Sequence, residues 1–143
     1  APRLVDVART RNENAPAPIA SFSVADARSL PQEDGSADAI LVMGPLYHLL
    51  SREDRVGSLR EAFRVLVVGG VSVVAAISRY ASTLDGLFRK LSLDPRFAKI
   101  RDRDLVDGQH RNETKHPHYF TTAYFHRPED LRSEMESAGY RGV

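Results

Sequence analysis

Tyr47 and His48 are the adjacent pair with the clearest capacity for chemistry in this sequence of 143 residues. They follow Gly44-Pro45, directly behind an apolar run. A histidine can act as a general base because imidazole titrates near neutral pH, and a tyrosine can orient a polar ligand. The alternative is that the two rings pack within their own loop and close it. The sequence leaves both interpretations open, since it does not fix the distance to a reacting group.

Further candidate residues stand at the ends of three apolar runs. The segments are Ala25-Asp26-Ala27, Met43-Gly44-Pro45 and Ile77-Ser78-Arg79. If the runs are parallel strands, their carboxyl ends meet at one edge of the sheet, which is where α/β proteins bind ligands. Each residue also has a simpler interpretation: Asp26 as a turn or cap residue, Gly44 as an ordinary turn glycine, and Met43 as part of the core.

Histidines and tyrosines gather in the polar segment 94–126, among them His116, His118, Tyr119 and His126. Imidazoles can bind zinc or iron, but the spacing of these histidines matches no standard metal pattern, so we predict no metal site. Long irregular segments in compact domains are often functional. We therefore expect a substrate-covering insert with an aromatic lining, and a plain surface loop is the alternative.

The elements that position these residues alternate between helices and strands. Apolar periodicity and capping signals predict helices at 1–13, 52–66, 84–91 and 128–138, and apolar runs predict strands at 19–25, 37–43 and 71–77. Residues 94–116 show no clean period, and residues 140–143 resemble the start of another strand. This order predicts an α/β sandwich with a mostly parallel sheet whose buried strands are covered by helices on both faces.

Helix 52–66 carries boundary signals at both ends. Ser51 is expected to be its N-cap, with Asp54 as the capping partner three residues later. Gly69-Gly70 is expected to end the helix before the next strand begins.

The composition excludes several classes of function. The 20 Lys and Arg residues nearly balance the 19 Asp and Glu residues, so no general surface for nucleic acid or an anionic membrane is evident. The absence of cysteine excludes a thiolate nucleophile, disulfides and cysteine-bound metals. No apolar run reaches the roughly 20 residues that span a bilayer, and no signal pattern is present. We expect a cytoplasmic protein that binds neither nucleic acid nor membrane.

The order and spacing of segments over residues 22–78 resemble class I S-adenosylmethionine-dependent methyltransferases of the small-molecule type. The matching pieces are Ala25-Asp26-Ala27-Arg28-Ser29-Leu30-Pro31, Asp34-Gly35-Ser36-Ala37-Asp38, Gly44-Pro45-Leu46-Tyr47-His48, Glu61-Ala62-Phe63-Arg64-Val65-Leu66 and Gly69-Gly70. The resemblance implies a Rossmann-like methyltransferase sandwich. It also implies transfer of the methyl group of S-adenosylmethionine to an O, N or C nucleophile of a small molecule.

The resemblance assigns cofactor contacts to the first two strand ends. The Asp26 carboxylate would accept a hydrogen bond from the adenine amino group, and the Ala27 amide would meet an adenine ring nitrogen. Met43 and Gly44 would line the cofactor, because a glycine allows close approach to the backbone.

Contacts to the methyl acceptor are expected from later residues. Tyr47 and His48 would face the acceptor, with His48 as the general base if the reaction uses one, because methyl transfer often needs only alignment. His118, Tyr119 and Arg79 would contact the acceptor.

Two parts of the family pattern are missing, the glycine-rich loop and the acid that binds the ribose. We therefore interpret residues 1–143 as a single partial domain, N-terminally truncated and without its first strands, that carries the insert 94–126. An exposed central sheet edge favours pairing with a second copy, which predicts a homodimer. The alternative function is a non-catalytic methyltransferase-like interaction or dimerisation module. A nucleotide-dependent oxidoreductase has less support, since its glycine fingerprint is absent as well.

Overall fold

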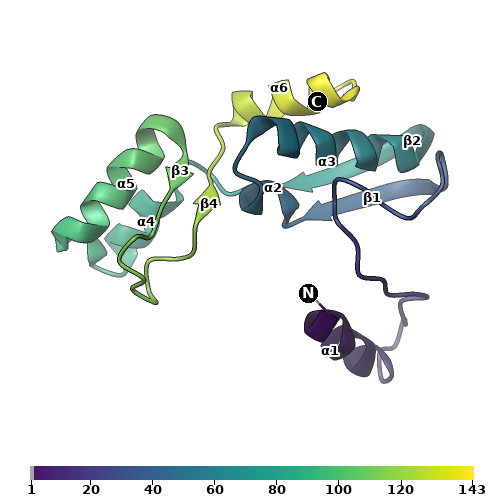
Figure 1. The fold of residues 1–143 in the computed structure, drawn as a ribbon, viewed down its shortest axis with the longest axis horizontal. Coiled ribbons are helices and arrows are strands. Elements are labelled where there is room, and N and C mark those ends of the chain that lie inside the picture. The colour runs from purple at the N-terminus through teal and green to yellow at the C-terminus, as the bar shows by residue number, and fades with distance from the viewer. Residues whose placement is uncertain (1) are drawn as a thin grey trace.

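Two parallel strands joined by a helix form the centre of the fold (Figure 1). In the computed structural model, which describes residues 2–143, β1 (Ala37–Met43) pairs in parallel with β2 (Leu66–Ala75). Helix α3 (Arg52–Val65) connects them, so both strands end at the same edge of the sheet. The prediction of an α/β architecture with a parallel sheet is confirmed for this unit. Within the described residues, the parallel sheet has two strands.

Helix α3 begins where its sequence signals place it but ends earlier than predicted. The Ser51 hydroxyl accepts a hydrogen bond from the Asp54 amide and donates one to the Asp54 carboxylate, so Ser51 is the N-cap. The helix ends at Val65, and the prediction that Gly69-Gly70 ends it is wrong. The two glycines lie inside β2, near a shift in the pairing register, and Gly69 has a φ of 83°. Glycine suits this irregularity because a positive φ is costly for other residues.

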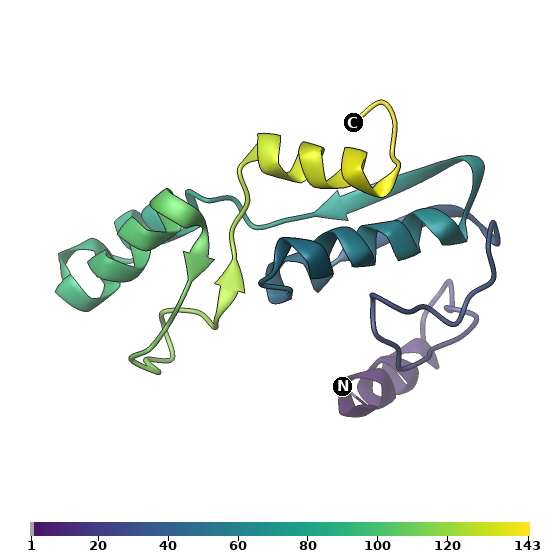
Figure 2. The same cartoon turned by 45° about the horizontal axis from the view of Figure 1, so that its top comes forward.

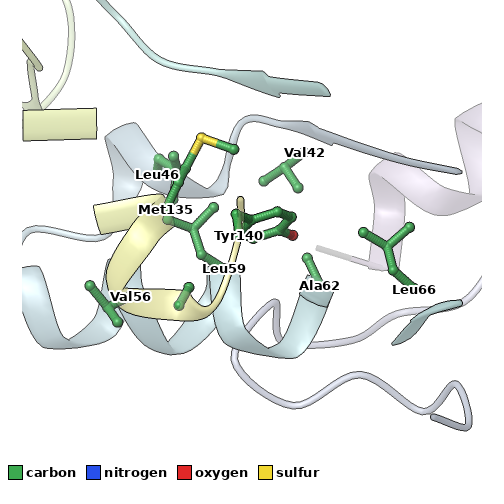
Figure 3. Packing of buried hydrophobic residues seen from close by; sticks show 9 residues of the cluster. Val42, Leu46, Val56, Leu59, Ala62, Leu66, Met135 and Tyr140 are labelled. Atoms are coloured by element: carbon green, nitrogen blue, oxygen red, sulfur yellow. The ribbon is translucent and has the colours of Figure 1, made fainter. Parts of the chain in front are cut away.

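One face of the sheet packs against α3 and α6 (Pro128–Ala138). Side chains from β1, α3 and α6 meet in one buried cluster (Figure 3). Its members are Val42, Leu46, Val56, Leu59, Ala62, Leu66, Met135, Ala138 and Tyr140. Helix α6 begins at Pro128, as predicted, and Gly139 caps it with a φ of 113°. We call β1, α3, β2 and α6 the sheet lobe.

The opposite face of the same sheet is exposed to solvent. Leu41, Met43, Val71 and Val73 on this face are 70%, 65%, 62% and 54% exposed. The prediction that helices cover both faces is therefore wrong for residues 2–143. Helix α1 (Pro2–Asn12) has no buried residue, and Figures 1 and 2 both show it apart from α3 and α6. Because strand side chains alternate between faces, the apolar run of β1 turns Ile40 and Val42 toward the helices, and Val42 is its one fully buried residue.

Residues 77–126 form a second lobe beside the sheet, which we call the cavity lobe. It contains α4 (Ala81–Phe88), the 3-10 turn η1 (Leu91–Leu93), α5 (Pro95–Asp107) and the antiparallel pair of β3 (Gln109–His110) and β4 (Ala123–Tyr124). Phe97, Ile100 and Tyr119 form its small core.

Helix α5 lies where an irregular segment is predicted, so the interpretation of residues 94–116 is wrong in its first half. The Asp94 carboxylate caps the helix by accepting a backbone amide hydrogen bond, and Gly108 ends it with a φ of 72°. Its buried residues are Phe97, Ile100 and Asp104. One of these three buried residues is an aspartate, and most of the exposed residues of the helix are charged, so the segment is polar overall although its buried positions recur at helical spacing.

Three further boundaries differ from the predictions. Residues 19–25 and 140–143 form no strand, because within the described residues neither segment pairs with a neighbouring strand. The helix predicted at 84–91 ends at Phe88, since Lys90 adopts a left-handed φ of 57°. None of the helices described in residues 2–143 combines the length and apolarity needed to cross a membrane.

Candidate active site

Strand β1 ends in a sharp turn at Gly44. Its φ of 134° and ψ of −45° are tolerated best by glycine, and α2 (Pro45–His48) begins directly after it. A Cβ on Gly44 would lie 3.4 Å from the Tyr47 hydroxyl oxygen, so the tyrosine already closes over this position. The rings of Tyr47 and His48 have centroids 4.7 Å apart and are tilted by 57°. Gly44, Tyr47 and His48 therefore lie together at the carboxyl end of β1, next to the exposed Met43.

Ion pairs bring Asp26 to the same end of the sheet lobe. Arg28 Nη2 lies 2.8 Å from Asp26 Oδ2, and Arg28 Nη1 lies 2.7 Å from Asp54 Oδ1. Asp54 is in the first turn of α3, which follows β1 in the chain and begins at the carboxyl end of that strand. Asp26 and Ala27 therefore reach the predicted edge, although they follow a loop rather than a strand.

Arg28 also sets the ionisation of Asp26. Hydrogen bonds from the side chain and then the backbone of Arg28 lower the pKa of the Asp26 carboxyl from 3.8 to about 2. Asp26 is therefore ionised at neutral pH. A carboxylate has about four positions that can accept hydrogen bonds, so Asp26 can accept from a ligand as well as from Arg28.

Replacing Arg28 by glutamine is expected to return the pKa of Asp26 toward its ordinary value, because the guanidinium is the largest cause of the shift. In an NMR titration of the carboxyl group, the midpoint would move from about 2 toward 3.8. Arg132→Gln, which changes an exposed arginine on α6, is the control and should leave the midpoint in place. An unchanged midpoint in Arg28→Gln would show that another group depresses this pKa.

A cavity of about 370 Å³ opens near the carboxyl end of β2. Its apolar lining is Ile77, Ala81, Phe97, Pro117, Tyr119, Phe120 and Phe125, and its polar lining is Ser82, Asp85, Arg89, His110 and His118. This size, and a mainly apolar wall with few polar groups, are typical of small-molecule sites. His118 and Tyr119, two of the predicted acceptor contacts, both belong to the lining.

Three buried polar residues form a network at one wall of the cavity. The Ser82 hydroxyl donates to Asp104 Oδ2, and His110 Nδ1 lies 2.8 Å from the same oxygen. His110 Nε2 lies 2.7 Å from the carbonyl oxygen of Tyr119. Both ring nitrogens of His110 thus face acceptor oxygens. This is not a nucleophilic triad, because the aspartate rather than the histidine takes the serine hydrogen bond.

Arg89 and Asp85 stand at the outer rim of the cavity. Arg89 Nη1 lies 3.2 Å from Asp85 Oδ2, and Arg89 Nη2 lies 3.0 Å from His118 Nδ1. The side chains of Arg89 and Asp85 are 44% and 45% exposed, so solvent reaches this rim. Beneath it, the buried Tyr119 donates its hydroxyl to Asp94 and stacks on His116.

Five polar residues of this site are not predicted from the sequence: Ser82, Asp85, Arg89, Asp104 and His110. Three of them show a pattern that could have revealed them, because Ser82, Asp85 and Arg89 recur at the spacing of one helix face. Asp104 and His110 join the site only through the packing of α5 against α4 and of β3 against α5.

Arg79 lies behind the cavity rather than in its lining. It is 5% exposed, and its Nη2 lies 3.3 Å from Tyr124 Oη and 3.0 Å from Asp130 Oδ2. These bonds connect the segment that follows β2 with β4 and α6, and so join the two lobes. The predicted contact between Arg79 and an acceptor stays a prediction, one that this position does not favour, because the guanidinium is bound within the chain.

The histidines of segment 94–126 divide into two places. His116 and His118 lie near each other beside Tyr119. His126 is buried elsewhere, with its Nε2 at 3.1 Å from Glu134 Oε2, and Arg55 binds the same carboxylate at 2.7 Å. Within the part of the chain that the structure describes, no group of three or more His, Asp or Glu residues is arranged to hold a metal ion.

The sheet lobe contains a parallel β–α–β unit, in which a glycine turn follows β1 and a cavity lies beyond the carboxyl end of β2. This arrangement is typical of α/β proteins that bind ligands at the carboxyl edge of the sheet. The family model described as Methyltransferase domain matches residues 1–74. Since this match spans more than half of the 143 residues, the chain belongs to this family of class I S-adenosylmethionine-dependent methyltransferases. The match includes Asp26 and Gly44 and ends before the cavity lobe. No solved structure matches the chain.

Proposed function

We propose that the protein transfers the methyl group of S-adenosylmethionine to an oxygen, nitrogen or carbon nucleophile of a small molecule held in the cavity. The observation that carries this proposal is the position of the cavity. It opens beyond the carboxyl end of β2, and β2 pairs with β1, the strand that leads into Gly44. Members of the family generally use this cofactor. A mainly apolar cavity of about 370 Å³ suits a small acceptor.

The residues at the end of β1 fit one side of the cofactor. Asp26 is an exposed, ionised carboxylate that can accept the adenine amino group, and the Ala27 amide can donate to a ring nitrogen. Gly44 has no Cβ and Met43 is 65% exposed, so a ligand can approach this strand end beside the Tyr47 ring that covers Gly44. When bound, the cofactor supplies an electrophilic methyl group carried on a sulfonium.

The chain itself contributes alignment and exclusion of water. Phe97, Tyr119 and Phe125 are each at most 3% exposed and give the acceptor a dry wall. Tyr47 and His48 lie on α2, which packs against β4 of the cavity lobe. From there they would orient the acceptor, and His48 would remove a proton from a nucleophile that carries one. An acceptor with an available lone pair needs only alignment.

Calorimetry with S-adenosylhomocysteine on the full-length protein tests this function. Binding is expected, and Asp26→Asn should weaken it by about tenfold, because the loss of a charged acceptor removes about 1.5 kcal/mol. Asp38→Asn is the matched control, since Asp38 is exposed near the start of β1, at the opposite end from Gly44. Absence of binding to the unchanged protein would contradict a cofactor-dependent function.

A non-catalytic interaction or dimerisation module is the second candidate, and the exposed sheet face favours it. Leu41, Met43, Val71 and Val73 form a contiguous apolar surface that pairing with a second copy would cover. The same calorimetry separates the candidates. A protein that sediments as a dimer and binds no S-adenosylhomocysteine would support the module, whereas cofactor binding supports the enzyme whether or not a dimer forms.

A further inference from the structure

One face of α4 gives the cavity a polar stripe. Ser82, Asp85 and Arg89 recur at helical spacing, and all three line the cavity. A helix rises 1.5 Å per residue, so the first and last of these side chains are roughly 10 Å apart along its axis. The facing walls are apolar and aromatic. The cavity is therefore an apolar slot with a distinct polar group toward each end.

The inner end of the slot presents a hydrogen-bond acceptor. Ser82 is 5% exposed, and its proton is directed to Asp104, so its oxygen offers only lone pairs to a ligand. His110 Nδ1 lies 3.5 Å from this oxygen, but both ring nitrogens already have closer acceptors. A ligand group at this end must therefore be a donor, such as a hydroxyl or an amine.

The outer end of the slot presents donors. Arg89 carries five N–H groups, and its bonds to the Asp85 carboxylate, the His118 ring and the His118 carbonyl oxygen have lengths of 3.2, 3.0 and 3.4 Å. These bonds are exposed to solvent, so a ligand carboxylate can replace the weaker ones. Asp85 offsets part of the positive charge, which favours a group with a single negative charge over a phosphate.

We propose that the cavity binds a flat, mainly aromatic molecule with a hydroxyl or amino group at Ser82 and a carboxylate at Arg89. Phe97, Tyr119 and Phe125 would hold the ring system between the two ends, since aromatic side chains pack well on flat apolar ligands. The assignment of the hydroxyl or amino group as the group that receives the methyl rests on the proposed function. The polarity of the slot, with an acceptor at one end and donors at the other, does not depend on that function.

Three related probes test this polarity by calorimetry on the full-length protein without cofactor. They are a hydroxynaphthoate with its two substituents at opposite ends of the ring pair, the naphthol that lacks the carboxylate, and the naphthoate that lacks the hydroxyl. The hydroxynaphthoate is expected to bind at least about tenfold more tightly than either of the others, because each polar group forms one directed interaction.

Two variants assign the ends of the slot. Arg89→Gln is expected to weaken hydroxynaphthoate and naphthoate by about tenfold while sparing naphthol. Ser82→Ala should weaken hydroxynaphthoate and naphthol while sparing naphthoate. Arg60→Gln, an exposed change on α3, is the control and should alter none of the three affinities. If a variant does not fold, the order of the three probe affinities for the unchanged protein still tests the polarity of the slot.

Equal affinities for the three probes, or no binding of any of them, would overturn this inference, as would variants that weaken all three alike. The outcomes stay separate from those for the methyltransferase proposal. Binding of S-adenosylhomocysteine without probe binding would overturn the slot polarity alone. Probe binding in the expected order without S-adenosylhomocysteine binding would overturn the methyl transfer and leave the ligand class in place.

Discussion

Arg55→Met is expected to lower the free energy of unfolding by about 3–5 kcal/mol, because it leaves a buried carboxylate without its main partner. Arg55 and Glu134 are each 2% exposed, and their closest N–O distance is 2.7 Å. The Arg55 guanidinium also donates to the carbonyl oxygens of Leu49 and Leu50 and lies 3.5 Å from the centre of the Tyr124 ring. A methionine fills similar space but supplies none of these interactions. Urea denaturation at neutral pH measures the loss.

The pH dependence of the variant gives a second readout. Burial would raise the pKa of Glu134, but hydrogen bonds from His126 and Arg55 outweigh burial and hold it below 4.5. In the unchanged protein the ionised Glu134 carboxylate contributes to stability above pH 4.5. This stabilisation is lost as the pH falls through the lowered folded-state pKa of Glu134. Without Arg55, burial favours the protonated acid, so stability should rise as the pH falls. The difference in the free energy of unfolding between Arg55→Met and the unchanged protein is therefore expected to become smaller in acid.

Two controls isolate the buried pair. Arg60→Met changes an exposed arginine on the same helix and should alter stability by no more than about 0.5 kcal/mol. Adding Glu134→Gln to Arg55→Met should recover part of the loss, because no buried charge is then left alone. A double variant that is as unstable as the sum of the two single variants would contradict a direct interaction between these side chains.

Gly108→Ala is expected to destabilise the protein by about 3 kcal/mol through two effects. Gly108 has a φ of 72°, which is costly for alanine. An added Cβ would also collide with the carbonyl oxygen of Phe125 and would lie 3.0 Å from Arg79 Nη2. The chain cannot easily move away, because the Phe125 amide donates to the Gly108 carbonyl at 2.8 Å. Thermal unfolding followed by circular dichroism measures the effect.

Gly57→Ala is the matched control for that substitution. Gly57 lies inside α3 without a positive φ, and an added Cβ would have no atom within 4 Å. The control should therefore stabilise the protein by about 0.5–1 kcal/mol, since alanine favours a helix over glycine. Equal effects of the two substitutions would show that the junction between α5 and β3 is looser than the structure indicates.

Both junctions bear on function because each adjoins a contact between the two lobes: Glu134 also binds His126, and Arg79 also binds Asp130. Arg55 on α3 and Glu134 on α6 hold the chain that leads from β4 into α6, and Gly108 lies where Arg79 meets Phe125 at the cavity wall. A variant that loosens either junction is therefore expected to weaken probe binding even where the residues proposed to bind cofactor at Gly44 are unchanged. In such a variant the affinity for the probes should fall, while the affinity for S-adenosylhomocysteine should stay the same.

Local signals made several elements predictable. The Ser51 cap, Pro128 and Gly139 mark helix ends through their own backbone chemistry, and the apolar run 37–43 is strand-like in any context. The edge that carries Gly44, Tyr47 and His48 follows from chain order, because parallel strands end on the same side. These features depend on residues close together in the sequence.

Tertiary structure decided the rest, because the remaining features depend on residues far apart. Arg55 and Glu134 are 79 positions apart, and neither reads as a buried charge until α3 packs on α6. Ser82 and His110 are 28 positions apart, and both contact the Oδ2 atom of Asp104, a buried residue on a helix whose exposed residues are mostly charged. Which face of the sheet is buried likewise depends on tertiary packing, because α3 and α6 cover one face and leave the other exposed. The sequence by itself thus determined the family and the edge of the sheet that carries Gly44, and packing determined where the cavity lies and which polar groups it presents.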